Sequence, residues 1–163
     1  NIIRGLSSKP FDDEGCSMEK ISLVENGVLK NWILDTTTAK QLGVVSNSRA
    51  SRGVSSPPTP SPTNMFIDNG SKSSKQLLNE VNNGFYVTEL IGQGVNLITG
   101  DYSRGASGFK IENGKISFPI NEVTIADNLN DMFNKMIIAN DLEFIYSINT
   151  PTLAIEGMTI AGV

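Results

Sequence analysis

The stretch that decides the fold of this chain runs from position 100 to 118: Gly100-Asp101-Tyr102-Ser103-Arg104-Gly105-Ala106-Ser107-Gly108-Phe109-Lys110-Ile111-Glu112-Asn113-Gly114-Lys115-Ile116-Ser117-Phe118. A glycine-dense segment leads into two runs in which apolar and polar residues alternate, a pattern typical of strands. Asn113-Gly114 separates the two runs, and this dipeptide tolerates the positive φ angles of a tight hairpin turn. The stretch therefore predicts an antiparallel hairpin.

The same turn signal occurs once more, at Glu25-Asn26-Gly27, between apolar runs at 18–24 and 28–34. We interpret it as a second antiparallel hairpin. Further strands are expected at 65–67, 85–91, 95–99, 142–147 and 152–160, the last with Gly157 as a possible bulge.

Three short helices are expected between these strands. Asp35 is suited to cap a helix over 36–42, with Gly43 just past its end. Ser73 and Gln76 have the spacing of a capping box before a second helix. A third helix is predicted after a cap at 127 or 128 by apolar residues on one face, which we interpret as core packing: Leu129, Met132, Phe133 and Met136.

Many short strands with three helices indicate a mainly β (α+β) fold. We expect a curved antiparallel sheet or a barrel-like β domain with about three short peripheral helices. The length of 163 residues suits a single domain over 1–163. Residues 46–63 stand apart because they are rich in Pro and Ser. This segment is either a surface loop or linker, or the lining of a binding cleft in which Arg49 and Arg52 hold carboxylates.

Composition excludes several classes of function. The net charge of −4 and the lack of a basic stripe argue against direct contact with nucleic acid. No run of about 18 apolar residues is present, so no membrane span is predicted. The single cysteine, Cys16, rules out an internal disulfide and suits a reducing compartment. Because the chain contains no histidine, Ser103 cannot belong to a Ser-His-Asp triad.

A family resemblance is carried by several segments that follow one another along nearly the whole chain. Besides 100–114 they include Phe11-Asp12-Asp13-Glu14-Gly15, Ser56-Pro57-Pro58-Thr59-Pro60-Ser61-Pro62-Thr63-Asn64, Tyr86-Val87-Thr88-Glu89-Leu90-Ile91-Gly92, Asn140-Asp141-Leu142-Glu143-Phe144 and Ile155-Glu156-Gly157-Met158-Thr159-Ile160-Ala161-Gly162. Together they resemble the C-terminal domain of the TldD/PmbA family, and in particular its PmbA (TldE-like) branch, also called modulator of DNA gyrase. The resemblance implies that the chain is the C-terminal part of a longer protein.

The resemblance also implies where zinc chemistry resides. In the family, the TldD-like subunit is the peptidase, and a His-Glu-x-x-x-His helix and a cysteine near the C-terminus hold its zinc. That cysteine would fall shortly after Asn140-Asp141-Leu142-Glu143, but residues 144–151 contain none. We therefore expect no catalytic residue, no metal ligand and no cofactor on this chain, with zinc only on a TldD-like partner.

The expected function is that of a non-catalytic PmbA/TldE-like subunit in a cytoplasmic TldD/TldE-type zinc metallopeptidase complex for peptide maturation and degradation. The subunit would supply chamber wall and peptide-binding surface. Expected partners are a TldD-like catalytic subunit or a second copy, and a peptide or unfolded polypeptide, without nucleic acid or membrane. Two alternatives stay open: the C-terminal part of an active zinc metallopeptidase subunit with its ligands upstream, or a homodimeric structural and interaction module.

The residues 101–104 are the first candidates for peptide binding. Gly100 and Gly105 flank them and permit close approach of another backbone. Arg104 could bind a peptide carboxylate, and Tyr102 offers a flat face and a hydroxyl; alternatively, Asp101 and Arg104 form a local ion pair that fixes a turn. The full set of peptide-binding candidates is Asp101, Tyr102, Ser103, Arg104, Arg49, Arg52 and Asn64.

Overall fold

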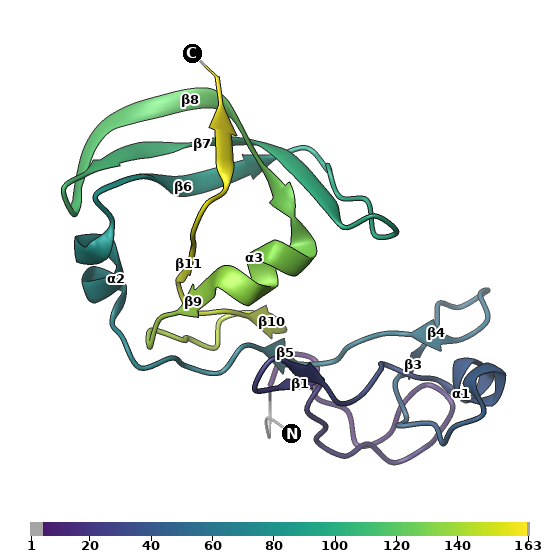
Figure 1. Ribbon diagram of the computed structural model, residues 1–163. Coiled ribbons are helices and arrows are strands. Elements are labelled where there is room, and N and C mark those ends of the chain that lie inside the picture. Colours follow the sequence, from purple (N-terminus) through teal and green to yellow (C-terminus); the bar gives the residue numbers. More distant parts are fainter. Residues whose placement is uncertain (1–4, 163) are drawn as a thin grey trace. The chain divides into compact units, whose positions relative to one another are not determined.

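The computed structural model describes residues 5–162, which contain twelve strands and three short helices (Figure 1). These residues form two compact units. Unit 1 comprises residues 5–67 and Glu143–Asn149, and unit 2 comprises Asp68–Leu142 and residues 150–162. Each unit is described by itself. The expectation of one domain over 1–163 stays a prediction.

The centre of unit 2 is a four-stranded antiparallel sheet with the strand order β12-β8-β7-β6. Its strands are β6 (Asn83–Ile91), β7 (Asp101–Glu112), β8 (Lys115–Asn128) and β12 (Thr159–Ala161). Asn113 and Gly114 join β7 to β8 with φ angles of 48° and 75°, as a tight hairpin turn requires. The predicted hairpin is confirmed, and its strands are longer than the sequence pattern indicated.

This sheet is curved and open (Figure 1). Register shifts interrupt the ladder between Val87 and Glu89 on β6 and between Ala106 and Gly108 on β7. Such bulges bend strands and increase their twist. At Gly108 a Cβ atom would lie 1.9 Å from the carbonyl oxygen of Tyr86, so the bulge requires glycine there. The predicted mainly β fold is confirmed as a curved sheet, whereas a closed barrel is not formed.

The core of unit 2 lies on one face of this sheet. Ala106, Val123 and Ile125 are buried there, on β7 and β8. Four partly buried side chains pack against them: Phe85, Tyr102, Ile120 and Met158. Because the buried cluster is small, hydrogen bonds of the sheet are a large part of what orders this unit.

All three predicted helices are present. They are α1 (Thr36–Leu42), α2 (Ser74–Glu80) and α3 (Leu129–Lys135). Asp35 and Ser73 cap the first two helices in capping boxes, and Asn128 caps the third. The expected core packing of the third helix is only partly found: Leu129, Met132 and Met136 are half-buried, none is fully buried, and Phe133 is 66% exposed.

The remaining strands are short. In unit 1, β1 (Val24–Glu25) pairs with β2 (Val28–Leu29), β3 (Ala50–Ser51) with β4 (Thr59–Pro60), and β5 (Met65–Phe66) with β10 (Ile148–Asn149). In unit 2, β9 (Met136–Ile138) pairs with β11 (Leu153–Ile155). The turn at Asn26-Gly27 is confirmed, although its strands are only two residues long. The Pro/Ser-rich segment 46–63 is not a free linker, because β3 and β4 fold it into a hairpin.

Three predicted strands differ from the observed structure. Residues 96–99 form a turn in which Asn96 Oδ1 accepts hydrogen bonds from the backbone N–H groups of Ile98 and Thr99. Segment 142–147 is irregular, because Asn149 Oδ1 accepts hydrogen bonds from the backbone N–H groups of Ile145 and Tyr146. Segment 152–160 divides into β11 and β12 around Gly157, whose φ is 78°. In the first two cases an asparagine side chain replaces the strand partner.

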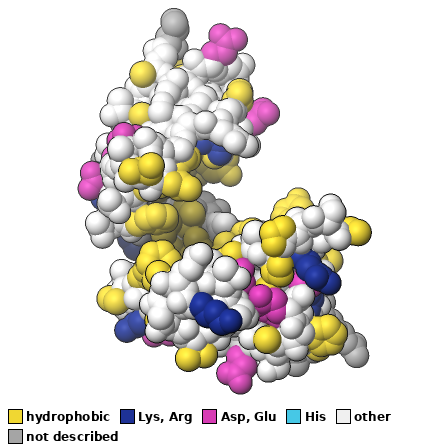
Figure 2. All heavy atoms as spheres, turned by 90° about the vertical axis from the view of Figure 1, so that its right-hand side faces the viewer, with side chains coloured by type: hydrophobic (Ala, Val, Ile, Leu, Met, Phe, Trp, Pro, Cys, Tyr) yellow, Lys and Arg dark blue, Asp and Glu magenta, His cyan; other side chains and the backbone are white. Residues whose placement is uncertain are grey.

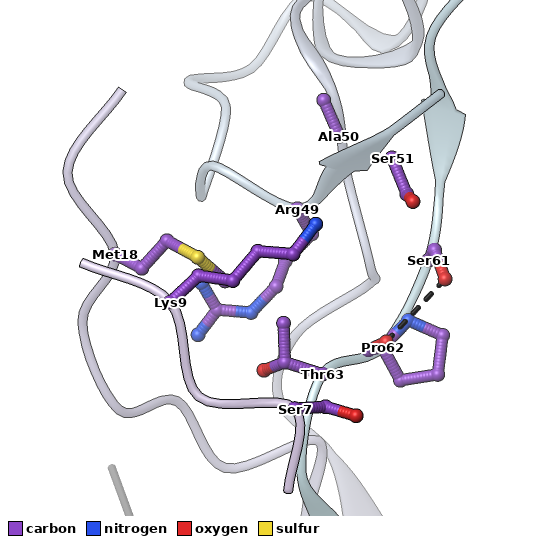
Figure 3. Close-up of a pocket in the computed structure, with 9 residues that line it drawn as sticks. All are labelled: Ser7, Lys9, Met18, Arg49, Ala50, Ser51, Ser61, Pro62 and Thr63. Carbon is purple, nitrogen blue, oxygen red and sulfur yellow. Dashed lines mark hydrogen bonds between the residues drawn. The ribbon is translucent and has the colours of Figure 1, made fainter. Parts of the chain in front are cut away.

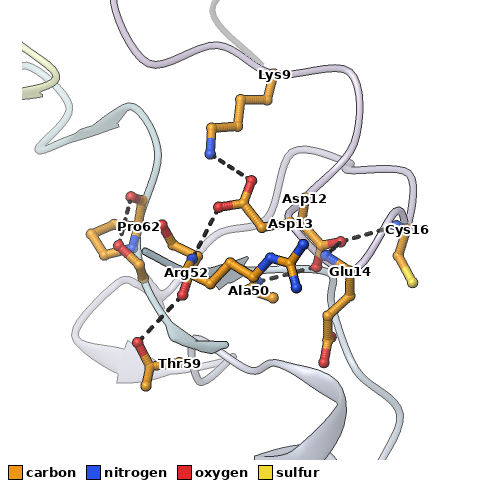
Figure 4. Close-up of polar contacts among 11 residues, drawn as sticks. Lys9, Asp12, Asp13, Glu14, Cys16, Ala50, Arg52, Thr59 and Pro62 are labelled. Carbon is orange, nitrogen blue, oxygen red and sulfur yellow. Dashed lines mark hydrogen bonds and ion pairs between the residues drawn. The ribbon is translucent and has the colours of Figure 1, made fainter. Parts of the chain in front are cut away.

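A buried carboxylate organises unit 1. Asp12 is 2% exposed, and Oδ1 accepts hydrogen bonds from the backbone N–H of Glu14 (3.1 Å) and Cys16 (2.9 Å) (Figure 4). Its Oδ2 accepts from the backbone N–H of Ala50 at 3.1 Å, at the start of β3. Asp12 thereby ties the Pro/Ser-rich hairpin to the loop at 11–17. In the described range, no helix is long and apolar enough to cross a membrane.

Replacement of Asp12 by Ala should destabilise the protein, because three backbone N–H groups lose their acceptor. We expect a decrease in the free energy of unfolding of about 2–4 kcal/mol, measured by urea unfolding. The control is Asp68→Ala, at an exposed position, which should change stability by less than about 0.5 kcal/mol. Equal effects of the two variants would contradict the structural role of Asp12.

Stability should also decrease in acid through the cap of α1. The side chain and then the backbone N–H of Thr38 donate hydrogen bonds to Asp35, and these lower its pKa. A lowered pKa in the folded state stabilises the protein above the unfolded value of about 3.9, and this contribution is lost as the pH falls through the folded value. Urea midpoints measured between about pH 6 and pH 2.5 should therefore fall, and less steeply in Asp35→Asn. Identical slopes would refute this assignment.

Candidate functional site

The peptide-binding candidates fall into the two units. Arg49, Arg52 and Asn64 belong to unit 1, and residues 101–104 belong to unit 2. Within each unit, the structure shows which of these side chains lie together.

The side chains of residues 101–104 do not form one cluster. These residues open β7, and successive side chains of a strand point to opposite faces of the sheet. Tyr102 packs against the core, and Arg104, two residues further along the strand, lies on the same face. Asp101 and Ser103 are exposed and lie on the opposite face of the sheet. The sheet therefore separates the four candidates into two pairs.

The expected ion pair between Asp101 and Arg104 is not formed. Asp101 Oδ2 accepts a hydrogen bond from Thr99 Oγ1 at 2.6 Å. Arg104 Nη2 donates to the carbonyl oxygen of Leu90 at 3.4 Å. The reason is the strand itself, because side chains three positions apart on a strand point away from each other.

The backbone of residues 101–104 is already paired on both sides. On one side it pairs with residues 125–128 of β8. On the other side the segment 94–96 lies against it: Ser103 N–H donates to the Gly94 carbonyl at 2.7 Å, and Asn96 N–H donates to the Asp101 carbonyl at 2.8 Å. A Cβ atom on Gly94 would lie 1.6 Å from the Ser103 carbonyl oxygen. The close approach of another backbone is thus used inside the chain, and no free edge remains here for a peptide.

A polar pair lies beneath this part of the sheet. On the neighbouring strand β8, Ile125 lies opposite Arg104 and Asp127 lies opposite Tyr102. Because Tyr102 and Arg104 lie on the core face, Asp127 lies on that face too. Among the described side chains, Arg104 Nε and Asp127 Oδ2 are buried atoms without a hydrogen-bond partner. Asp127 Oδ2 lies 3.9 Å from Lys135 Nζ. Buried polar atoms of this kind are usually satisfied by water or a ligand. The sequence indicated Asp127 only as a helix cap.

The sheet has two outer strands, β12 and β6, and β6 is the longer of them. In residues 5–162 no strand pairs with the outer side of β6. Its nine residues include neither proline nor lysine, the usual protections of an edge. Four of its apolar side chains are exposed: Tyr86, Val87, Leu90 and Ile91. Figure 2 shows that hydrophobic side chains are also prominent on the surface of the protein.

One of the three unit 1 candidates lines a small cavity. A cavity of about 140 Å³ is lined by residues of the N-terminal loop and of the Pro/Ser-rich hairpin (Figure 3): Ser7, Lys9, Met18, Arg49, Ala50, Ser51, Ser61, Pro62 and Thr63. Arg52 is not among them; its backbone N–H donates to Asp13 Oδ2 at 3.0 Å (Figure 4). Asn64 bridges the backbone N–H of Ser7 and the hydroxyl of Ser8. Of the three candidates, only Arg49 faces the cavity.

Arg49 is buried in a cage of carbonyl oxygens. Its Nη1 donates to the carbonyls of Asn47 and Ser48, both at 3.0 Å, and its Nη2 donates to the carbonyl of Glu19. Burial lowers the pKa of the guanidinium, and the Asp12 carboxylate nearby opposes that shift. Arginine stays charged in proteins, so a positive charge is fixed beside the cavity.

Comparison with known proteins identifies the family. The chain matches the model of the PmbA/TldA metallopeptidase C-terminal domain over residues 1–162. It belongs to the PmbA/TldD family. Metalloprotease PmbA of Escherichia coli O157:H7 is 40% identical over 163 residues, which are 99% of this chain and 34% of that protein.

Solved structures of the PmbA/TldD family agree with this result. One from Thermotoga maritima, named as a modulator of a DNA gyrase, has a TM-score of 0.82 and 33% identity, covering 97% of this chain and 36% of that chain. TldE from Thermococcus kodakarensis has a TM-score of 0.81 and 26% identity, covering 94% and 36%. The chain thus spans about a third of the length of these relatives.

The zinc that the name metallopeptidase implies does not fit the donors of this chain. Zinc sites use Cys, His, Asp and Glu, and the sequence has no histidine and one cysteine. Around Cys16, both oxygens of Asp12 accept backbone N–H groups, and Glu14 Oε2 accepts the N–H and hydroxyl of Thr36. In residues 5–162, no group of three such side chains is placed to hold a metal ion. No step of zinc chemistry is therefore assigned to these residues.

A methyl group on Gly94 should disrupt the pairing of segment 94–96 with β7. We expect Gly94→Ala to lower the free energy of unfolding by about 1–3 kcal/mol, measured by thermal or urea unfolding. Gly105→Ala is the control, since its Cβ would lie at an ordinary 3.4 Å from Ile91 Cβ. If Gly94→Ala were as stable as the control, the close approach at Ser103 would be wrong.

Proposed function

We propose that the chain is part of a non-catalytic PmbA/TldE-like subunit of a TldD/TldE-type zinc metallopeptidase complex. The observation that carries the proposal is the donor set: a chain of a metallopeptidase family offers no imidazole and no cysteine after residue 16. Hydrolysis by zinc needs protein ligands and an open coordination position for water or substrate. In this proposal the TldD-like partner supplies the zinc, and this chain supplies chamber wall and peptide-binding surface.

The free edge of β6 supports the peptide-binding part of the proposal. An extended peptide can add to an exposed edge by backbone hydrogen bonds, while side-chain contacts supply specificity. β6 is nine residues long and offers exposed apolar side chains for such contacts. This edge takes the place of residues 101–104, whose backbone is already paired.

The wider role follows from the family. We propose a cytoplasmic complex that matures or degrades peptides and unfolded polypeptides, with no direct contact to DNA. The net charge of −4 supports the last point, because DNA-binding surfaces are basic. A relative named metalloprotease PmbA and a structural neighbour named TldE support the branch.

Metal analysis tests the catalytic assignment. The subunit purified alone should contain less than about 0.1 zinc per chain and should not hydrolyse peptides, whereas its complex with a TldD-like partner should contain zinc and hydrolyse them. The matched control is the same complex in which both histidines of the partner's His-Glu-x-x-x-His helix are replaced. Stoichiometric zinc and turnover in the subunit alone would indicate an active peptidase with ligands outside this chain. A stable homodimer that binds neither partner nor peptide would indicate an interaction module.

A charge on the edge strand tests the peptide site. Ile91 is 53% exposed near the end of β6. We expect Ile91→Lys to weaken peptide binding by at least about tenfold, because a lysine protects an edge from further pairing. Ile116→Lys, at a 46% exposed position on β8, is the control and should retain binding. A peptide with N-methylated backbone should also fail to bind, and equal binding of all variants would refute the edge.

A further inference from the structure

The cavity of unit 1 has a marked asymmetry of charge. Two of its nine lining residues, Lys9 and Arg49, are cationic, and no lining residue is acidic. Four others carry hydroxyl groups: Ser7, Ser51, Ser61 and Thr63. Figure 3 shows the stem of Lys9 running alongside the Arg49 guanidinium, with Ser7 on the same loop as Lys9 and with Ser51, Ser61 and Thr63 on the Pro/Ser-rich hairpin, where the Ser61 hydroxyl donates to the Pro62 carbonyl at 3.3 Å. Cations and hydroxyl donors around one small space favour an anion.

Hydrogen bonds hold the charged guanidinium of Arg49 in place, but among the described residues no carboxylate contacts it to neutralise its charge. Its hydrogen bonds go to three neutral carbonyl groups. In the described part of the chain, no carboxylate lies within ion-pairing distance of its guanidinium, as the three ion pairs involve only lysines. Asp12 is nearby, but its oxygens are occupied by backbone N–H groups. A buried cation without a close counter-ion is costly, and a bound anion would offset that cost.

The second cation lies at the rim. Lys9 Nζ contacts Asp13 Oδ1 at 2.9 Å, which uses one of its three N–H donors. Asp13 does not line the cavity; it is held by Lys9 and by the backbone N–H of Arg52. Lys9 therefore has donors left for a ligand in the cavity.

We propose that this cavity binds a carboxylate group, between Lys9 and Arg49. A volume of about 140 Å³ equals that of about five water molecules. This space suits a carboxylate with a few attached atoms. A peptide can supply the group as its C-terminal carboxylate or as an Asp or Glu side chain, and both share this chemistry. The site is independent of the β6 edge, which belongs to the other unit.

The test uses three probe peptides and two variants at Ser61, in the protein at full length. The probes are acetyl-Gly-Gly-Ala with a free carboxylate, its C-terminal amide, and acetyl-Gly-Glu-Gly-amide, with affinity measured by calorimetry or NMR titration. Ser61→Asp places a carboxylate inside the cavity and should abolish binding, whereas the neutral Ser61→Asn should retain it. Binding of one or both carboxylate probes without the amide supports the site and identifies the source of the group.

A second variant tests the site independently, in case Ser61→Asp does not fold. Lys9→Met removes the rim cation at an exposed position and should weaken binding of the carboxylate probes by at least about tenfold. Lys30→Met is the matched control, since Lys30 is exposed in the same unit and does not line the cavity, and it should leave that binding unchanged. The proposal is overturned if the amide binds as well as the acids, if inorganic phosphate competes better than acetate, or if Lys9→Met binds like wild type.

Discussion

The pairing of β7 with both of its neighbours is the constraint on which unit 2 depends. β8 occupies one side of β7 from end to end, and β6 followed by segment 94–96 occupies the other. β7 therefore has a neighbour on both sides, apart from the bulges, and only the outer strands have an edge to offer. For the peptide binding proposed above, residues 101–104 therefore have no free edge, and β6 is the candidate strand.

Unit 1 is held together by a different kind of interaction. Its strands are two residues long and cannot order it alone. Instead, the buried carboxylate of Asp12 collects backbone N–H groups, and the buried guanidinium of Arg49 collects backbone carbonyls. These two groups fix the Pro/Ser-rich hairpin against the N-terminal loop. The same scaffold leaves a positive charge beside a cavity, which links the stability of this unit to its proposed chemistry.

The chain belongs to a metallopeptidase family, but it has no histidine and only one cysteine to bind zinc. These two facts together limit the role that we propose for it. A fold of this family can be retained without metal ligands, because fold and chemistry are separable. The sheet edge of unit 2 and the cavity of unit 1 are the two sites proposed for recognition of a peptide-like ligand. Among the described residues, no group of three His, Cys, Asp or Glu side chains is placed to hold a metal ion.

The sequence by itself determined the local structure. The caps at Asp35 and Ser73, the turns at Asn26-Gly27 and Asn113-Gly114, and the mainly β class follow from side-chain chemistry within a few residues. Only the tertiary structure decided which edges are free and which charges are buried. The pairing of segment 94–96 with β7 closes the edge at residues 101–104, although Asn96 and Asn149 replace two predicted strands by loops through local hydrogen bonds. The buried groups Asp12 and Arg49 bond to residues 38 and 30 positions away, at Ala50 and Glu19, and local patterns do not contain such pairings.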